Sequence, residues 1–224
     1  MSDDLSYIRK WLRRGLSKDR KVLDLSNRKI NNEICVELVE NLQVEGLEVL
    51  YLHSNNIKDE GMEELAEWEL FASLRELWFY ENRIGDDGVK ALAQSANVTR
   101  LRYLSLYTNR IGDAGAIALA ESESLRRLET LDLSFNRIGD AGAIALAESE
   151  HLSKLKILHL DSNRIGAAGL EALAQARGLE SLEELHVMYN KLEPDALKLL
   201  RESPRLQKLS TVKADLYPEI PEGY

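Results

Sequence analysis

Histidine and aspartate side chains recur at a constant spacing in the second half of the chain. His186 follows His159 at the same interval at which His159 follows Asp132, and Asp161 lies two residues after His159. Imidazole and carboxylate groups are ligands that a transition metal accepts. A metal-dependent enzyme is therefore one hypothesis, if each interval leads to a neighbouring strand. We favour a polar interaction surface and predict no metal and no cofactor, because side chains on one face of a sheet project in parallel.

Aromatic residues recur at the same interval in the first half of the chain. Tyr51 and Trp78 are one interval apart, and so are His53 and Tyr80, and Tyr80 and Tyr107. Tyrosine and tryptophan dominate protein–protein interfaces, because they bury a large area and lose few rotamers. The sequence contains no G-x-S-x-G turn, no phosphate-binding glycine loop and no cysteine with a matching base. We therefore predict a binding protein and no enzyme.

A 27-residue repeat positions both groups of side chains. The segment NRIGDAGAIALAESE occurs twice without change, at 109–123 and 136–150. The register places Arg28 and Tyr217 in the asparagine position of degenerate end units, so the chain contains about eight units. Degenerate ends are typical of capping units. Around the repeated segment the pattern L-x-x-L-x-L-x-x-N occurs six times in one register, and its asparagines are Asn55, Asn82, Asn109, Asn136, Asn163 and Asn190.

This pattern resembles the leucine-rich repeat, and the longer unit N-R-I-G-D-x-G-x-x-A-L-A resembles its ribonuclease-inhibitor type, which has a 27-residue repeat. The resemblance covers roughly residues 20–217. It implies an α/β fold, a solenoid or horseshoe with a concave parallel sheet and convex helices. Strands stack at about 4.8 Å and helices at about 8 to 10 Å, which independently places the strands on the inner edge of an arc. The resemblance says little about function, because the same scaffold serves inhibitors, GTPase regulators and sensors.

We expect three regions along the chain. Residues 21–209 should form the leucine-rich repeats. Residues 210–224 should form a degenerate last unit and a C-terminal cap or tail, since Pro218 and Pro221 exclude a continuing helix. Residues 1–20 should form an N-terminal capping helix, because apolar residues recur there at steps of three and four, at Leu5, Ile8, Leu12 and Leu16.

Alternation within each unit decides which side chains are buried. In L-x-L the leucines share one face of a short strand, and the residue between them points to the concave surface. The asparagine amide after the strand can satisfy backbone groups of the turn. Cys35 falls in an apolar helix column and should be a packed core thiol. We expect an aspartate to be the N-cap of its own helix in several units, at Asp59, Asp86, Asp113 and Asp140.

The residues that we predict to bind a partner stand at outward strand positions or at the rim of the sheet. They are Tyr51, His53, Trp78, Tyr80, Tyr103, Tyr107, Phe135, His159, Asp161, His186, Met188 and Tyr189. The alternative is that aromatic residues merely suit parallel strands and pack on one another. That alternative does not explain why most of the rings fall in adjacent units. The same columns carry one basic residue, Lys213, against seven acidic ones, which are Asp24, Glu76, Glu81, Asp132, Asp161, Glu184 and Asp215.

The whole-chain charge disfavours nucleic acid as a partner. The chain has 38 acidic and 29 basic residues, a net charge of −9 and a pI of about 5.1, which argues against contact with phosphate backbones. We assign the basic residues of segment 9–21 to the polar face of the capping helix. A second basic column follows the asparagine position, and we expect its members to pair within their own units with acidic residues such as Asp86, Asp113 and Asp140; they are Lys29, Arg83, Arg110, Arg137, Arg164 and Lys191.

Hydropathy and cysteine content limit the class of protein. The mean hydropathy is −0.31, and no apolar run approaches the roughly 20 residues that a membrane span needs. The single cysteine excludes an internal disulfide, and the first twenty residues carry charge throughout and lack the apolar core of a secretory signal. We therefore predict a cytoplasmic, monomeric protein without a membrane span.

Three functional hypotheses remain at this point. We predict a non-catalytic module that binds a protein or peptide of basic character on an aromatic and acidic concave face. The first alternative is a regulator of a small GTPase or another signalling enzyme that acts through the repeat-edge loops. The second is a scaffold without an evolved target, produced by recent duplication or engineering of near-identical units.

Overall fold

One parallel sheet runs through the described part of the chain, its strands following one another in sequence order. The computed structural model describes residues 6–191 and 194–214, and the side chains of all of these except 194–197. Each strand pairs with the strand of the next repeat at the equivalent position, as in Leu104 with Leu131. The strands are β1 (Val22–Asp24), β2 (Val49–Tyr51), β3 (Glu76–Trp78), β4 (Tyr103–Ser105), β5 (Thr130–Asp132), β6 (Ile157–His159), β7 (Glu184–His186) and β8 (Thr211–Lys213).

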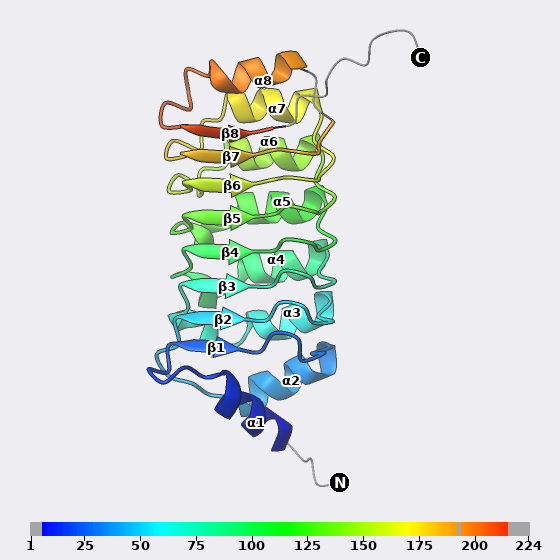
Figure 1. Cartoon of the computed structure of the whole chain (residues 1–224), viewed down its shortest axis with the longest axis vertical. Coiled ribbons are helices and arrows are strands. Elements are labelled where there is room, and N and C mark those ends of the chain that lie inside the picture. Colours follow the sequence, from blue (N-terminus) through cyan, green and yellow to red (C-terminus); the bar gives the residue numbers. More distant parts are fainter. Residues whose placement is uncertain (1–5, 192–193, 215–224) are drawn as a thin grey trace, which may run out of the picture.

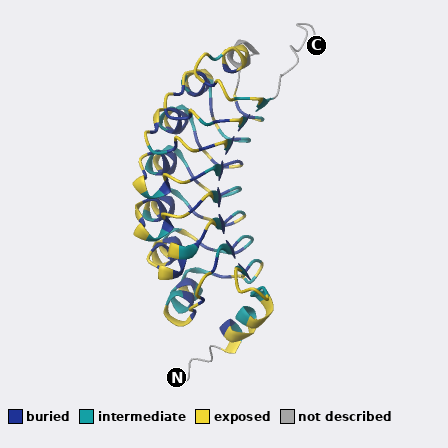
Figure 2. Ribbon diagram, turned by 90° about the vertical axis from the view of Figure 1, so that its left-hand side faces the viewer, coloured by how far each residue is buried: buried dark blue, intermediate teal, exposed yellow. Residues whose placement is uncertain are grey.

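Helices form a second layer behind the sheet (Figure 1). Seen from the side, the helices follow the outer curve of an arc and the strands its inner curve (Figure 2). The α/β horseshoe predicted from the repeat is confirmed. The α-helices are α1 (Ser6–Gly15), α2 (Asn32–Asn41), α3 (Asp59–Ala66), α4 (Asp86–Gln94), α5 (Asp113–Ala120), α6 (Asp140–Glu148), α7 (Ala167–Ala174) and α8 (Pro194–Arg201), and the 3₁₀ helices are η1 (Glu69–Ser73), η2 (Ala96–Val98) and η3 (Glu123–Leu125).

The core lies between the two layers and is built from the leucine positions of the repeat. Leu104, Leu131 and Leu158 are completely buried, as the alternation predicts. Each such side chain contributes roughly 1.5 to 3 kcal/mol when it leaves water. Cys35 is also buried, and this burial raises the pKa of its thiol to about 12. Cys35 is therefore a packing residue, because a neutral buried thiol is a poor nucleophile.

The repeated asparagine joins consecutive units through its side-chain amide. The Nδ2 group of Asn136 donates to the carbonyl oxygens of Leu106 and Leu133, both at 3.0 Å, and its Oδ1 accepts the N–H of Ile111 at 3.0 Å. One amide thus satisfies backbone groups of two units, as predicted. The residue before each of these turns adopts a left-handed conformation, with φ of 57° at Phe135, which points its side chain to the rim.

The prediction that each aspartate caps its own helix is wrong. The N-cap residues of α5 and α6 are Gly112 and Gly139, and Asp113 is the first residue of α5. Its Oδ1 instead accepts the N–H groups of Gly139 at 2.7 Å and Gly142 at 2.9 Å, both in the following unit. The carboxylate therefore caps the next helix, because the units are offset so that each helix begins beside the first turn of its predecessor.

The predicted pairing within the basic column is also wrong. No ion pair in the described part of the chain involves Arg83, Arg110, Arg137 or Arg164, since the aspartates expected to partner them bind backbone N–H groups. Ion pairs occur instead where the strands begin. There Glu129 lies 2.6 Å from Arg102 and 2.7 Å from Lys156.

The two ends of the described solenoid are α1 and β8. Helix α1 falls within segment 1–20, and its Ile8 is buried. Leu16 forms an antiparallel bridge with Leu23, which covers the outer edge of β1. Strand β8 lies in segment 210–224, at the position expected for the last unit. Five residues named above lie outside the described residues, namely Leu5, Asp215, Tyr217, Pro218 and Pro221.

We predict that Asp113→Ala destabilises the solenoid by about 1 kcal/mol, because loss of a helix cap typically costs this much. The measurement is the urea midpoint of unfolding followed by circular dichroism. Asp87→Ala is the matched control, since Asp87 is exposed in the first turn of α4 and its carboxylate accepts no hydrogen bond within the described residues. Equal midpoints for the two variants would contradict a capping role for Asp113.

Candidate interaction surface

The outward face of the sheet carries the side chains that alternation assigns to it. Leu77 and Phe79 are completely buried, whereas Trp78 and Tyr80, which alternate with them, remain partly accessible. The rings therefore lie on the face opposite the helices. The orientation follows from strand geometry alone, because successive side chains point to opposite sides.

Seven of the predicted residues form one continuous set of rings, which we name the aromatic cluster. The His53 and Tyr80 rings stack with centroids 4.0 Å apart, and the Trp78 and Tyr103 rings stack at 4.1 Å. Tyr80 and Tyr107 meet edge to face at 6.4 Å. These contacts fix side-chain rotamers before any partner arrives. The remaining members are Tyr51, 5.6 Å from Trp78, and Phe135, 5.0 Å from Tyr107.

The hydroxyl groups of Tyr51, Tyr80 and Tyr103 and the imidazole of His53 are neutral near pH 7. Burial raises the pKa of Tyr103 to about 12, and it also raises the pKa values of Tyr51 and Tyr80. Burial lowers the pKa of His53. The negative charge of this region therefore comes from carboxylates such as Glu76, whose Oε2 accepts the indole N–H of Trp78 at 3.3 Å.

A second group lies beyond the aromatic cluster, and we name it the histidine–carboxylate cluster: Asp132, His159, Asp161, Glu184 and His186. The two imidazole rings stack at 4.1 Å with an interplanar angle of 14°. His186 Nε2 lies 2.6 Å from Glu184 Oε1, and His186 Nδ1 lies 3.6 Å from Asp161 Oδ2. Ser105 and Ser134, which separate the two clusters, are almost fully buried.

The histidine–carboxylate cluster does not have the geometry of a metal site. Within the described residues, no three His, Cys, Asp or Glu side chains are placed to hold one ion. The stacked rings keep their in-plane nitrogen lone pairs in nearly parallel planes, so the two imidazoles cannot turn toward a common point. Asp161 Oδ1 is already bound to the backbone N–H of Met188 at 2.6 Å.

Burial and hydrogen bonding shift the pKa values of individual groups in this cluster in different directions. Burial lowers the pKa of His159 although Asp132 acts in the opposite direction, and burial raises the pKa of Asp161. The hydrogen bond with His186 lowers the pKa of Glu184. Hydrogen bonding to its charged form explains the lowered pKa of Glu184, and desolvation explains the shifted pKa values of His159 and Asp161.

The predicted residues differ in how well a partner could reach them. Phe135 and Tyr189 are 47% and 59% exposed at the rim, whereas His186 is only 8% exposed. Glu76 and Glu184 were left out of the predicted binding residues, yet they hold Trp78 and His186 in place. The signal that could have found them is their position two residues before each ring, because residues i and i+2 share one face of a strand.

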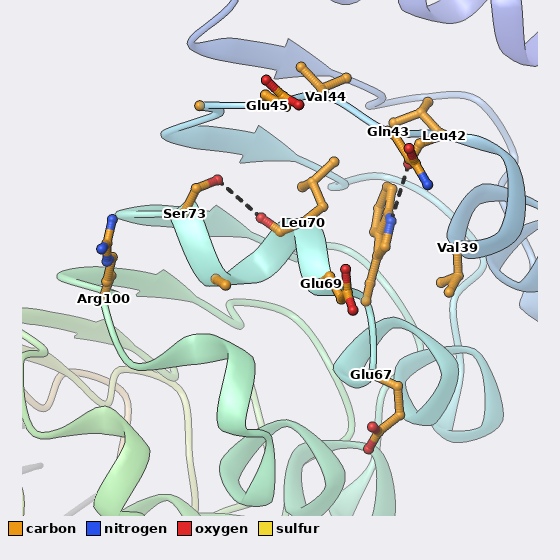
Figure 3. A pocket seen from close by; sticks show the side chains of 13 residues that line it. Val39, Leu42, Gln43, Val44, Glu45, Glu67, Glu69, Leu70, Ser73 and Arg100 are labelled. Carbon is orange, nitrogen blue, oxygen red and sulfur yellow. Dashed lines mark hydrogen bonds between the residues drawn. The ribbon is translucent and has the colours of Figure 1, made fainter.

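A hollow of about 630 Å³ lies at the edge where helices end and strands begin, away from both clusters. Figure 3 shows Leu42, Leu70 and Ser73 in its wall. The indole N–H of the buried Trp68 donates to the Leu42 carbonyl at 3.3 Å and closes the floor. Its described lining contains no histidine or cysteine. The Ser73 hydroxyl in that lining donates to the carbonyl oxygens of Leu47 and Leu70.

Family comparison agrees with this architecture. The family model described as "Leucine Rich repeat" matches residues 47–66, 72–93, 99–120, 125–147 and 151–174. The chain is a leucine-rich repeat protein. No curated protein sequence matches this leucine-rich repeat protein. No helix in the described part of the chain has both the length and the apolar character needed to cross a bilayer.

Two solved structures share the fold of this leucine-rich repeat protein. An internalin (inlF) from Listeria monocytogenes has 24% identity and a TM-score of 0.51 over 77% of this chain and 48% of that chain. An internalin C2 (inlC2) from the same organism has 24% identity and a TM-score of 0.57 over 88% of this chain and 81% of that chain. This chain therefore spans about half the length of the first internalin. The likeness establishes the fold.

We predict that the free energy of unfolding decreases as the pH falls from 7.5 to 5.5. Because burial holds the folded-state pKa of His159 below its usual value of 6.5, the unfolded chain takes up this proton first. An NMR titration of the imidazole signal, assigned with His159→Gln, should give a midpoint below 6.5. Urea unfolding should show a smaller pH-dependent loss in the variant. An imidazole midpoint above 6.5 would contradict the prediction.

Proposed function

We propose that this leucine-rich repeat protein is a non-catalytic module that binds a protein or peptide of basic character on the concave face of its sheet. The observation that carries the proposal is the aromatic cluster, a continuous set of stacked rings on a partly accessible surface. Soluble domains seldom leave so many rings accessible on one face without using them.

The rings are suited to act as anchors for a partner. Trp and Tyr contribute most to binding where they are packed at the centre of an interface. Since Trp78 already stacks on Tyr103, and Tyr80 on His53, binding immobilises few additional rotamers. We assign the anchor role to Tyr51, Trp78, Tyr80, Tyr103 and Tyr107.

Carboxylates around and beyond the rings support the basic character of the partner. Glu76 and Glu81 lie among the aromatic strands, and Asp132, Asp161 and Glu184 continue the negative charge toward β7. From β3 to β6 the distance is about 14 Å at the usual strand spacing. An extended segment of about four or five residues covers that distance. The partner motif is therefore an apolar or aromatic residue followed at that separation by Lys or Arg.

Several finer features belong to the same proposal. The helical second half of each repeat unit supports the ribonuclease-inhibitor-like type. The cytoplasmic location, the monomeric state and the absence of nucleic-acid binding stay predictions from composition and charge. Action on a small GTPase and a scaffold without a target stay alternatives, and peptide selection separates the second of them from the proposal.

We predict that Trp78→Ala combined with Tyr80→Ala reduces peptide binding at least about 30-fold, because hot-spot truncations cost about 2 kcal/mol or more. The probe is a random peptide library displayed on phage and selected against the full chain. Enriched peptides should combine aromatic or apolar residues with Lys or Arg, and their Kd is then measured by fluorescence anisotropy.

Leu199→Ala is the control for this experiment, because Leu199 is a large side chain, 48% exposed, on α8. The control should leave Kd unchanged within about twofold. The proposal fails if the enriched peptides are acidic, or if they bind the double variant as tightly as the wild type.

We predict that Glu76→Gln combined with Asp132→Asn slows association with the selected basic peptides more than it speeds dissociation. The amides keep an acceptor oxygen for Trp78 and Ser134, so the change removes charge and preserves local contacts. Surface charge acts mainly on the association rate, and stopped-flow measurements at low salt should show a reduction of about threefold or more. The difference should disappear near 1 M salt, where screening is nearly complete. A loss confined to the dissociation rate would contradict charge steering.

A further inference from the structure

Five exposed cations follow the turns after the strands, and we name them the basic ridge: Arg83, Arg110, Arg137, Arg164 and Lys191. Their backbones continue the hydrogen-bonded stacking of the sheet. The N–H of Arg110 donates to the carbonyl of Ile84 at 2.8 Å, and the N–H of Arg137 donates to that of Ile111 at 2.8 Å. Because hydrogen-bonded parallel segments are about 4.8 Å apart, successive cations stand about 4.8 Å apart in one row.

No member of the basic ridge forms an ion pair with any described residue. The nearest aspartates along the sequence are engaged elsewhere, as Asp86 Oδ1 accepts the N–H groups of Gly112 at 2.7 Å and Gly115 at 2.9 Å. Like charges at this spacing repel one another, so an anionic partner is attracted and relieves the repulsion.

We propose that the basic ridge is a second interaction surface, which binds an acidic α-helix of a partner protein lying along it. A helix with one carboxylate per turn presents its charges every 5.4 Å, close to the roughly 4.8 Å between successive cations. Over four steps the mismatch is about 2.4 Å, which flexible arginine side chains can absorb. The ridge is about 19 Å long, so it matches a helix of about 13 residues. Arginine favours such contacts because its guanidinium binds a carboxylate through two hydrogen bonds.

The surroundings of the ridge favour a helix over a nucleic acid. On the concave side Glu81 is exposed beside Arg83, and on the helix side Asp87 is exposed at the start of α4. An α-helix about 10 to 12 Å wide fits along the row of cations. A nucleic-acid duplex, whose major groove alone is about 12 Å wide, would overlie these carboxylates with its phosphates.

This surface is independent of the concave one. The ridge lies past the ends of the strands and is basic, whereas the concave face is aromatic and acidic. A chain with both surfaces could hold a basic partner and an acidic partner together.

The test is an NMR titration of the ¹⁵N-labelled full chain with a capped alanine-rich peptide of about 14 residues that carries one glutamate per helical turn. The backbone amides of the basic ridge should shift and those of β2–β4 should not. The double variant Arg110→Glu, Arg137→Glu should weaken binding at least about tenfold. The matched control is the double variant Arg100→Glu, Arg127→Glu. These exposed arginines are also one repeat apart, but they lie where the strands begin. The control should change Kd less than about twofold.

Further comparisons decide what the ridge recognises. A peptide of the same composition with its glutamates consecutive should bind less tightly, and Trp78→Ala combined with Tyr80→Ala should leave binding of the helical peptide unchanged. Unchanged binding there separates this inference from the proposed function. Equal losses in the ridge and control variants, equal binding of the two peptides, or tighter binding of a short oligonucleotide would each overturn it. If the charge-reversed variant loses its folded spectrum, Arg110→Gln combined with Arg137→Gln replaces it under the same criteria.

Discussion

The side-chain amide of the repeated asparagine sets the spacing on which the rest of the molecule depends. Asn82 donates to the carbonyls of Leu52 and Phe79 and accepts from the N–H of Ile57, so it joins two consecutive units. Buried amides without partners are costly, and each turn is therefore held at the distance where both units are satisfied. This places residues that are one repeat apart in sequence directly beside one another, as with Tyr51 and Trp78. A side chain on one strand thus meets the corresponding side chain on the next, and a column of the repeat becomes a continuous surface.

The same stacking leaves different charge patterns at the two ends of the strands. Where the strands begin, Glu48 and Glu129 alternate with lysines and arginines, and the charges compensate one another. Where the strands end, the carboxylates of Asp113 and Asp140 cap the helices of the following units. To cap a helix and also pair with an arginine, one carboxylate would have to reach the backbone N–H groups and the guanidinium at the same time. Capping the helix therefore leaves the arginine column uncompensated, and a basic surface arises on an acidic protein.

Much of the fold could be predicted from the sequence, because its determinants lie within one unit. The alternation in Leu131-Asp132-Leu133 decides which residues enter the core, and the structure buries both leucines. The destination of the Asp113 carboxylate could not be predicted in this way, because it depends on the offset between neighbouring helices. The same holds for Ser134, which stands at an outward position and is nevertheless almost fully buried. Alternation gives the direction in which a side chain points and contains no information about the size of its neighbours, on which burial also depends.

The turn before each asparagine shows how the fold and the candidate surface are connected. Six residues there adopt left-handed backbone conformations, and none of them is glycine, although glycine adopts this conformation without steric cost. A β-branched residue such as Thr108 or an aromatic one such as Phe135 costs about 1 to 2 kcal/mol in this region. The inter-unit hydrogen bonds hold the turn closed against that strain, as when the N–H of Phe135 donates to the carbonyl of Asp161 at 2.8 Å. Glycine would remove the strain and also the side chain. Phe135 and Tyr189, both exposed at such strained positions, therefore keep ring surface at the rim that glycine would not supply.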